Sequence, residues 1–421
     1  MTSRERVLKS LSHRQPDRLP VDFGGTFVSG MHASCVAALR DHYGLEKRPV
    51  RILDPGQMLG EIDGELKGII GIDTECVLRR TNRYGFPNEN WKPYRMYDGL
   101  EVLVPERFNP TIDENGDTLM YPDGDVTAPP SARMPKDGYF FDNIIRQEPI
   151  DEENLNPEDN IEDFTPIADR DLAFFSMATE RVRATGRAVV ASFGGTAFGD
   201  IALIPAPAIR NPKGIRDITE WYMATRTRQD YVHKVFEAQC AMALANLEKI
   251  AARVGDRVDV INVCGTDFGT QKSAFCSVET FRGLWMPYYK QVNSWIHKNT
   301  TWKTFKHSCG AVEKFIDSFI ECGFDILNPV QCAAAGMAPE HLKSRYGGQL
   351  VFWGGGVDTQ TVLAFGTPSE VRDQVLRRCE IFAAGGGFVF NTVHNIQAQT
   401  PVANIVALID AVKEFNGRSA V

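Results

Sequence analysis

The central pattern of the chain is Trp302-Lys303-Thr304-Phe305-Lys306-His307-Ser308-Cys309-Gly310. Its first six residues are β-prone, and a helical pattern starting near Val312 follows the glycine. Side chains alternate across a strand, so a continuing strand would place His307 and Cys309 on the same side. Imidazole and thiolate are zinc ligands, and two of them at one strand end indicate a metal site. A buried histidine beside an inert cysteine is the alternative.

Seven other short β-prone runs share this pattern, and most are followed by a glycine, a proline or a polar turn and then a helical stretch. They span residues 19–23, 74–79, 188–193, 258–263, 325–328, 350–353 and 387–391. Strands that alternate with helices form parallel sheets, and eight of them predict closure into a (β/α)8 TIM barrel. An open doubly wound sheet is the competing α/β architecture, but no G-x-G-x-x-G motif opens a helix.

Three helices are predicted with defined ends. Residues 228–253 are rich in Ala, Leu, Gln and Glu, and residues 368–382 begin with Thr367 as N-cap and Pro368 in the first turn. Residues 401–414 close the chain in the same way.

Residues 84–147 break the alternation of strands and helices. The pairs Asp98-Gly99, Asn115-Gly116 and Asp123-Gly124 separate short β-prone runs, which is typical of hairpins. This insertion follows the second predicted strand, so a barrel would place it on the C-terminal face, where active sites lie. We therefore interpret residues 1–421 as one barrel domain with a β-rich insertion that serves as a lid or docking segment. A decorative excursion away from the mouth is the alternative.

Composition excludes several classes of function. The chain has 421 residues, of which 43% are hydrophobic. Its formal net charge is -8 and it has no Lys/Arg cluster, so nucleic acid is not an expected partner. No apolar run is long enough to span a bilayer, and residues 1–16 lack the apolar region of a signal peptide. Nine cysteines without framework spacing then predict a cytoplasmic protein with reduced thiols. The oligomeric state stays open, a homo-oligomer included.

Polar side chains are concentrated just past the predicted strands. Those singled out are Asp267 and Gln271 after strand four, His307 and Cys309 after strand five, Asn328, Gln331 and Cys332 after strand six, and His394 after strand eight. The carboxyl ends of parallel strands meet at one rim of a barrel, so we expect these side chains to converge. Strand seven is followed by Gly354-Gly355-Gly356. We interpret this glycine run as a tight turn. The alternatives are a phosphate-binding loop and a gap that lets a large flat cofactor reach the barrel mouth.

A catalytic zinc ion takes three protein ligands and leaves one position open. We favour His394 as the third ligand because it lies in a polar run with no evident packing use, with Cys332 and Cys264 on adjoining strands as rivals. Asp267 is predicted to orient a ligand, bind substrate or act as a base, and the alternative is a residue that caps its own turn.

Five segments in this order resemble the uroporphyrinogen decarboxylase superfamily and, more closely, its corrinoid-linked methyltransferase branch. They are Arg4-Glu5-Arg6-Val7-Leu8 with Pro16-Asp17-Arg18, then Thr266-Asp267-Phe268-Gly269-Thr270-Gln271, His307-Ser308-Cys309-Gly310, Asp325-Ile326-Leu327-Asn328-Pro329-Val330-Gln331, and Val393-His394-Asn395-Ile396-Gln397. The resemblance covers most of the chain except the insertion, and it implies a (β/α)8 barrel. In that branch a His-x-Cys pair and a later residue, usually cysteine, bind zinc. Here the pair matches, while the later position is taken by His394.

True uroporphyrinogen decarboxylases carry arginines near the first strand that bind propionates. The corresponding residues here, Asp22-Phe23-Gly24-Gly25-Thr26, include no arginine, so a porphyrinogen would lack its bidentate partners. Porphyrinogen decarboxylation is therefore disfavoured, although His394 also aligns with a histidine that such decarboxylases use.

The leading hypothesis, on this resemblance, is a zinc-dependent methyltransferase. It would move a methyl group between a small substrate and the cobalt of a corrinoid (cobalamin) that a separate corrinoid protein carries. The substrate would be a thiol or a methyl ether such as a methoxylated aromatic, in which case the reaction is an O-demethylation. The expected roles are Zn²⁺ binding by His307, Cys309 and His394, catalysis by Asp267 and His394, and substrate binding by Gln271, Asn328 and Gln331.

Two other hypotheses remain. The first is metal-independent decarboxylation of a smaller carboxylate, with Asp267 and His394 as the working pair. The second is a barrel that binds a ligand without turning it over.

Overall fold

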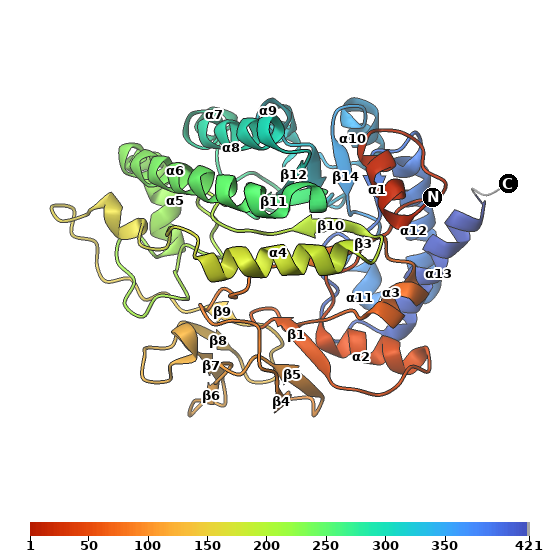
Figure 1. Ribbon diagram of the computed structural model, residues 1–421, viewed down its shortest axis with the longest axis horizontal. Coiled ribbons are helices and arrows are strands. Elements are labelled where there is room, and N and C mark those ends of the chain that lie inside the picture. The colour runs from red at the N-terminus through yellow and green to blue at the C-terminus, as the bar shows by residue number, and fades with distance from the viewer. Residues whose placement is uncertain (419–421) are drawn as a thin grey trace.

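The chain folds into a barrel of parallel strands surrounded by helices (Figure 1). The computed structural model describes residues 1–418, so residues 419–421 of the predicted domain lie outside the described part. Seven parallel strands form one sheet in the order β15-β14-β13-β12-β11-β10-β3. Their bounds are β3 Thr74–Val77, β10 Ala188–Ala191, β11 Val260–Cys264, β12 Lys303–His307, β13 Ile326–Asn328, β14 Val351–Trp353 and β15 Phe388–Val389.

The segment around Val21 joins the two edge strands of this sheet. Val21 forms a parallel bridge with Phe390, and the Asp22 amide donates to the Phe390 carbonyl at 2.8 Å. On the other side, the amide of Asp73, just before β3, donates to the Val21 carbonyl at 2.8 Å. The predicted first strand is therefore a single bridge that completes the ring, and the predicted TIM-barrel fold is confirmed.

Alternate strand residues fill the barrel interior. Val190, Val260 and Phe305 belong to one buried cluster, which also contains Val7 and Leu11 of helix α1 (Ser3–Leu11). The intervening strand residues belong to a second, larger cluster beneath the helices. This alternation of side chains is expected for strands that are covered on both faces. Helix α1 closes the N-terminal end of the barrel, where Val7 and Leu11 join the interior cluster.

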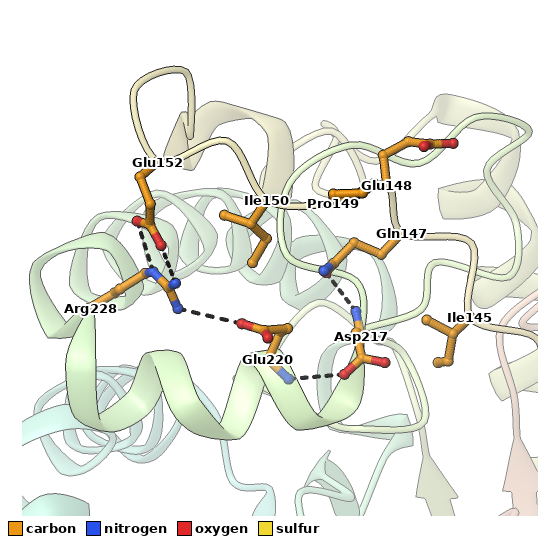
Figure 2. A pocket seen from close by; sticks show the side chains of 9 residues that line it. All are labelled: Ile145, Gln147, Glu148, Pro149, Ile150, Glu152, Asp217, Glu220 and Arg228. Atoms are coloured by element: carbon orange, nitrogen blue, oxygen red, sulfur yellow. Dashed lines mark hydrogen bonds and ion pairs between the residues drawn. The ribbon is translucent and has the colours of Figure 1, made fainter.

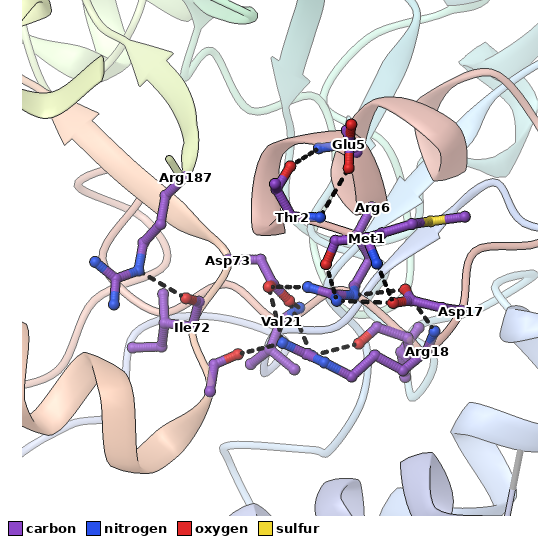
Figure 3. Close-up of polar contacts among 12 residues, drawn as sticks. Met1, Thr2, Glu5, Arg6, Asp17, Arg18, Val21, Ile72, Asp73 and Arg187 are labelled. Carbon is purple, nitrogen blue, oxygen red and sulfur yellow. Dashed lines mark hydrogen bonds and ion pairs between the residues drawn. The ribbon is translucent and has the colours of Figure 1, made fainter. Parts of the chain in front are cut away.

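An ion-pair cluster fastens the N-terminal segment to the barrel (Figure 3). Asp73, which is 0% exposed, accepts hydrogen bonds from Arg6 at 2.7 Å, Arg18 at 2.9 Å and the Val21 amide at 3.0 Å. Arg6 also donates two hydrogen bonds to Asp17, at 2.8 and 2.9 Å. One buried carboxylate thus connects α1, the Val21 segment and β3, which gives the first motif of the family resemblance a structural role.

The predicted helices are present. Residues 228–253 correspond to α6 Gln229–Val254, residues 368–382 to α12 Pro368–Ala383, and residues 401–414 to α13 Val402–Arg418. Thr367 caps α12 and forms a capping box with Glu370. The other helices are α2 Ala33–His42, α3 Gly64–Ile70, α4 Asp169–Arg183, α5 Ile218–Thr227, α7 Val278–Leu284, α8 Met286–Asn299, α9 Ile316–Glu321, α10 Pro339–Tyr346 and α11 Val362–Phe365.

The region 84–147 contains two groups of short strands that lie to one side of the barrel (Figure 1). The first sheet contains β4 Lys92–Arg95 and β5 Glu101–Val104, together with β1 Val50–Asp54 and β2 Leu59–Gly60. In the second sheet each strand pairs with the next along the chain: β6 Thr111–Ile112, β7 Thr118–Met120, β8 Ala132–Met134 and β9 Asp142–Asn143. Because β5 pairs with β1, the region is built together with a strand that precedes β3. Its role as a lid or docking segment stays a prediction.

Across residues 1–418, no helix combines the length and the apolar character that crossing a membrane requires.

Candidate metal centre

Three potential metal ligands meet where β12 and β15 end. In the described residues, donor atoms of His307, Cys309 and His394 all lie within 4.8 Å of one another, and we call these residues the trio. The Cys309 Sγ lies 3.4 Å from the His307 Nε2, and the two imidazole rings stand edge to face with centroids 5.4 Å apart. His307 is buried and the other two are half-buried. Two imidazoles and a thiol at this spacing fit the donor set that zinc prefers.

Cys309 is placed by a loop and not by the strand. Strand β12 ends at His307, so the alternation expected of a continuing strand does not act on Cys309. Instead, its amide donates to Asp267 Oδ1 at 2.6 Å, and the next amide, of Gly310, donates to Gln331 Oε1 at 2.7 Å. Side chains from two neighbouring strand ends therefore turn the loop so that the thiol faces the His307 ring.

Asn328 sets the orientation of the His307 ring. Its Oδ1 lies 2.6 Å from His307 Nδ1, while its Nδ2 donates to the Trp353 carbonyl at 2.8 Å. The second bond identifies the amide oxygen as the group that faces the imidazole, so Nδ1 carries the proton and Nε2 presents its lone pair to the trio. A fixed partner on the other ring nitrogen is typical of metal-binding histidines.

The three residues predicted to bind substrate lie in different environments. Asn328 is fully buried and holds the His307 ring, and Gln331 is buried and holds the Gly310 amide, so both position the metal ligands. Gln271 is exposed and donates to Gln360 Oε1 at 2.9 Å. The sequence interpretation missed Gln360, which connects Gln271 with Gln331 across the rim.

Burial sets the protonation of the trio. It lowers the pKa of His307 to about 4, and Lys306 contributes in the same direction. Burial, aided by the nearby His307, likewise lowers the pKa of His394 to about 4. Burial and the adjacent Asp267 raise the pKa of the Cys309 thiol well above its usual value. Near neutral pH both imidazoles are therefore free to bind a metal, whereas the thiol must first lose its proton.

Comparisons with known proteins fit this geometry. A family model described as "Uroporphyrinogen decarboxylase (URO-D)" matches residues 138–415, which include the whole trio. The chain belongs to the uroporphyrinogen decarboxylase family. Membership of this family supports the prediction that the protein is an enzyme.

Among solved structures, a methyltransferase from Methanosarcina mazei resembles this URO-D family member with a TM-score of 0.54, 14% sequence identity and 99% coverage of both chains. At this identity the likeness shows a shared fold. No curated protein matches the chain.

The rival third ligands of this URO-D family member lie elsewhere. Neither Cys264 nor Cys332 joins the trio within residues 1–418. Cys264 is buried near Lys306 and Tyr289, and the Cys332 thiol donates to the Val330 carbonyl at 3.4 Å. The geometry therefore favours His394.

A buried lysine lies directly beside the trio. Lys306 is 0% exposed, and its Nζ donates to the Thr266 and His307 carbonyls at 2.6 and 2.8 Å and lies 4.8 Å from the Phe268 ring centroid. Its charge favours the deprotonated form of Cys309. The sequence interpretation missed this residue, although a lysine inside a β-prone run next to the ligand motif was a usable signal.

The glycine run after β14 is required by packing. A Cβ at Gly355 would lie 2.7 Å from the Val330 carbonyl oxygen, and one at Gly356 would lie 2.2 Å from the Phe390 ring. These contacts favour the tight-turn interpretation of the run.

Proposed function

We propose that this URO-D family member is a zinc-dependent methyltransferase that moves a methyl group between a small substrate and the cobalt of a separate corrinoid protein. The observation that carries the proposal is the convergence of His307, Cys309 and His394, whose donor atoms lie within 4.8 Å of one another. Three protein ligands leave one position of a tetrahedral zinc site for a substrate. A methyl ether such as a methoxylated aromatic, or a thiol, offers an oxygen or sulfur atom that suits this position.

Each residue around the trio has a proposed task. His307 would bind through Nε2, because Asn328 holds Nδ1, and the loop fixed by Asp267 and Gln331 would present the Cys309 sulfur. Bound zinc would supply Lewis acidity, which makes an alkoxide a better leaving group and a thiolate easier to form.

Asp267 and His394 stay the proposed catalytic pair. Their groups lie close enough for each to influence the pKa of the other. The Asp267 carboxylate also lies 3.8 Å from His307 Nε2. Beside the open metal position, the Asp267 carboxylate would hold or release the proton of a substrate thiol or alcohol, while His394, as a zinc ligand, would act in catalysis through the metal.

The corrinoid would come from a partner that docks over the barrel mouth, because residues 1–418 form the barrel and the short strands beside it. The region 84–147 is the proposed lid or docking segment. A cytoplasmic location is part of the same proposal, and a homo-oligomer is compatible with it.

Zinc content tests the centre directly. We expect about one zinc per chain by elemental analysis, and loss of zinc in the His307→Ala Cys309→Ala double variant. A matched control is Cys332→Ala His341→Ala, which removes the same two residue types outside the trio and should keep zinc. Full zinc occupancy in the first double variant would refute the assignment.

Turnover separates the methyltransferase from the decarboxylase alternative. With a corrinoid protein and methoxylated aromatics or methylated thiols, we expect the absorbance change of methyl–cobalt formation, which a strong chelator abolishes. Release of carbon dioxide that survives the chelator would favour decarboxylation instead.

A further inference from the structure

A cavity beside the trio contains a cation without a partner. The cavity measures about 170 Å³, lies at the ends of β3, β10 and β11, and has apolar walls that include Phe27, Leu53 and Leu78. Arg79, two residues past β3, lines this cavity and a neighbouring one of about 480 Å³. Within the part of the chain that the structure describes, the Arg79 side chain makes no hydrogen bond or ion pair.

The backbone leaves room for Arg79. Gly194, just past β10, has a φ of +82°, and a Cβ there would lie 2.7 Å from the Arg79 Cδ. The side chain is exposed, and the space it faces is that of the two cavities. Surrounding protein still lowers the pKa of Arg79, against the attraction of Asp171. A cation that faces two cavities and makes no hydrogen bond or ion pair is typical of a residue that binds a ligand.

Three other charged residues line the smaller cavity: Arg83, Asp54 and Asp200. The nearby Asp54 and Asp200 carboxylates raise the pKa of Arg83. Asp54 in turn accepts a hydrogen bond from the Gln57 side chain at 2.9 Å. Two carboxylates of this cavity thus act on Arg83, whereas the carboxylate that acts on Arg79 is Asp171, which does not line it.

A second polar group of the cavity lacks a partner. Asn262 on β11 is 5% exposed, and its Oδ1 accepts no hydrogen bond from any described residue. Its Nδ2 approaches only the Ser192 hydroxyl, at 3.4 Å. A buried amide oxygen left unpaired is destabilising, and a hydroxyl group of a ligand would satisfy it.

The cavity adjoins the metal centre. Gly265 on its wall follows β11, and β11 pairs with β12, which ends at His307. Across this boundary, the Asp267 carboxylate is close enough to raise the pKa of Asp200 on the cavity wall. A molecule in the cavity would thus have one end toward Arg79 and the other toward the trio.

A hollow elsewhere on the surface shows how different this arrangement is (Figure 2). It measures about 480 Å³ and is lined by residues of 145–152 and of the α5 region. There Arg228 pairs with Glu152 and lies 3.6 Å from Glu220, so this guanidinium, unlike that of Arg79, has carboxylate partners.

We propose that Arg79 binds the carboxylate of the substrate, and that this substrate is a small carboxylic acid about one ring in size. The inference rests on the proposed function, whose substrate class it names. A guanidinium binds a carboxylate through two parallel hydrogen bonds, and a cavity of ~150 Å³ holds one benzene ring. A methoxylated benzoate fits both the charge and the size, and Asn262 would accept a hydrogen bond from a hydroxyl group on its ring.

Equilibrium binding of two isosteres tests the inference without turnover. 3-Methoxybenzoate and 3-methoxybenzamide differ in charge but hardly in shape, and calorimetry on the full chain, without a corrinoid protein, gives both affinities. We expect the benzoate to bind at least about tenfold more tightly. The preference should fall below about twofold in Arg79→Met and be partly kept in Arg79→Lys.

Arg133→Met is the matched control, because Arg133 lies on β8, away from the cavity, and should keep the preference. Thermal unfolding of Arg79→Met should occur at or above the wild-type temperature, since an unpaired cation is removed. Equal binding of benzoate and benzamide, or a preference that survives in Arg79→Met, would overturn the inference. Zinc content is measured on the same samples. A zinc-free chain with an Arg79-dependent preference would refute only the proposed function, and a zinc-loaded chain without the preference only the subsite.

Discussion

At the scale of single residues, the protonation of Cys309 links metal binding to pH. Its raised pKa keeps the thiol protonated near pH 7, while the pKa of about 4 for His307 and His394 keeps both imidazoles neutral. Zinc binding should therefore release about one proton, and affinity should rise about tenfold per pH unit between roughly pH 5 and 8. Below about pH 4 the histidines also gain protons, so affinity should fall more steeply.

Calorimetry in buffers with different ionisation enthalpies measures this proton release. Cys309→Ala should abolish it, because the remaining ligands are already unprotonated. A zinc affinity that does not change with pH in the wild-type protein would contradict the assignment of Cys309 as a ligand.

At the scale of elements, the loop after β12 depends on Gly310. Its φ is +87°, and a Cβ would lie 2.4 Å from the Gly269 carbonyl group in the loop after β11. Gly323 offers a matched control, since its φ is +82° but the nearest atom to a Cβ there would be the Asn293 Cβ at 3.4 Å, an ordinary van der Waals distance. Both alanine variants incur the left-handed strain, and Gly310→Ala adds a backbone clash of about 1–3 kcal/mol.

Urea unfolding should therefore show a larger loss of stability for Gly310→Ala than for Gly323→Ala. Zinc titrations should show weaker binding only for Gly310→Ala, because the clash displaces the loop that carries Cys309. Equal zinc affinities in the two variants would argue that the loop geometry is unimportant for the centre.

At the scale of the whole molecule, Asp73 joins the ends of the barrel wall. It is fully buried and binds Arg6, Arg18 and the Val21 amide. Asp73→Asn leaves two arginines without their buried counter-charge, so the free energy of unfolding should fall by about 3–5 kcal/mol. Asp17→Asn should cost about 1 kcal/mol or less, because the Asp17 side chain is 37% exposed. Denaturant titrations measure both, and equal losses would contradict a central role for Asp73 in barrel closure.

Local signals allowed much of the barrel to be predicted. The composition of α6 and the capping residues of α12 are local properties of these segments, so their predicted ends agree with the structure to within a residue. Strand β1 was missed because it pairs with β5, far along the chain, and carries little local signal. Arg79 was overlooked for a similar reason, since its lack of a partner depends on which residues surround it.

The amino-acid sequence by itself determined the alternation of strands and helices, the family, and the kinds of donor atom available at the strand ends. These properties reside in short segments, where periodicity and residue type act directly. Only the tertiary structure decided that His394, and neither Cys264 nor Cys332, meets His307 and Cys309. The reason is that closure of the barrel brings the end of its last strand beside its middle strands, and no local pattern records that distance.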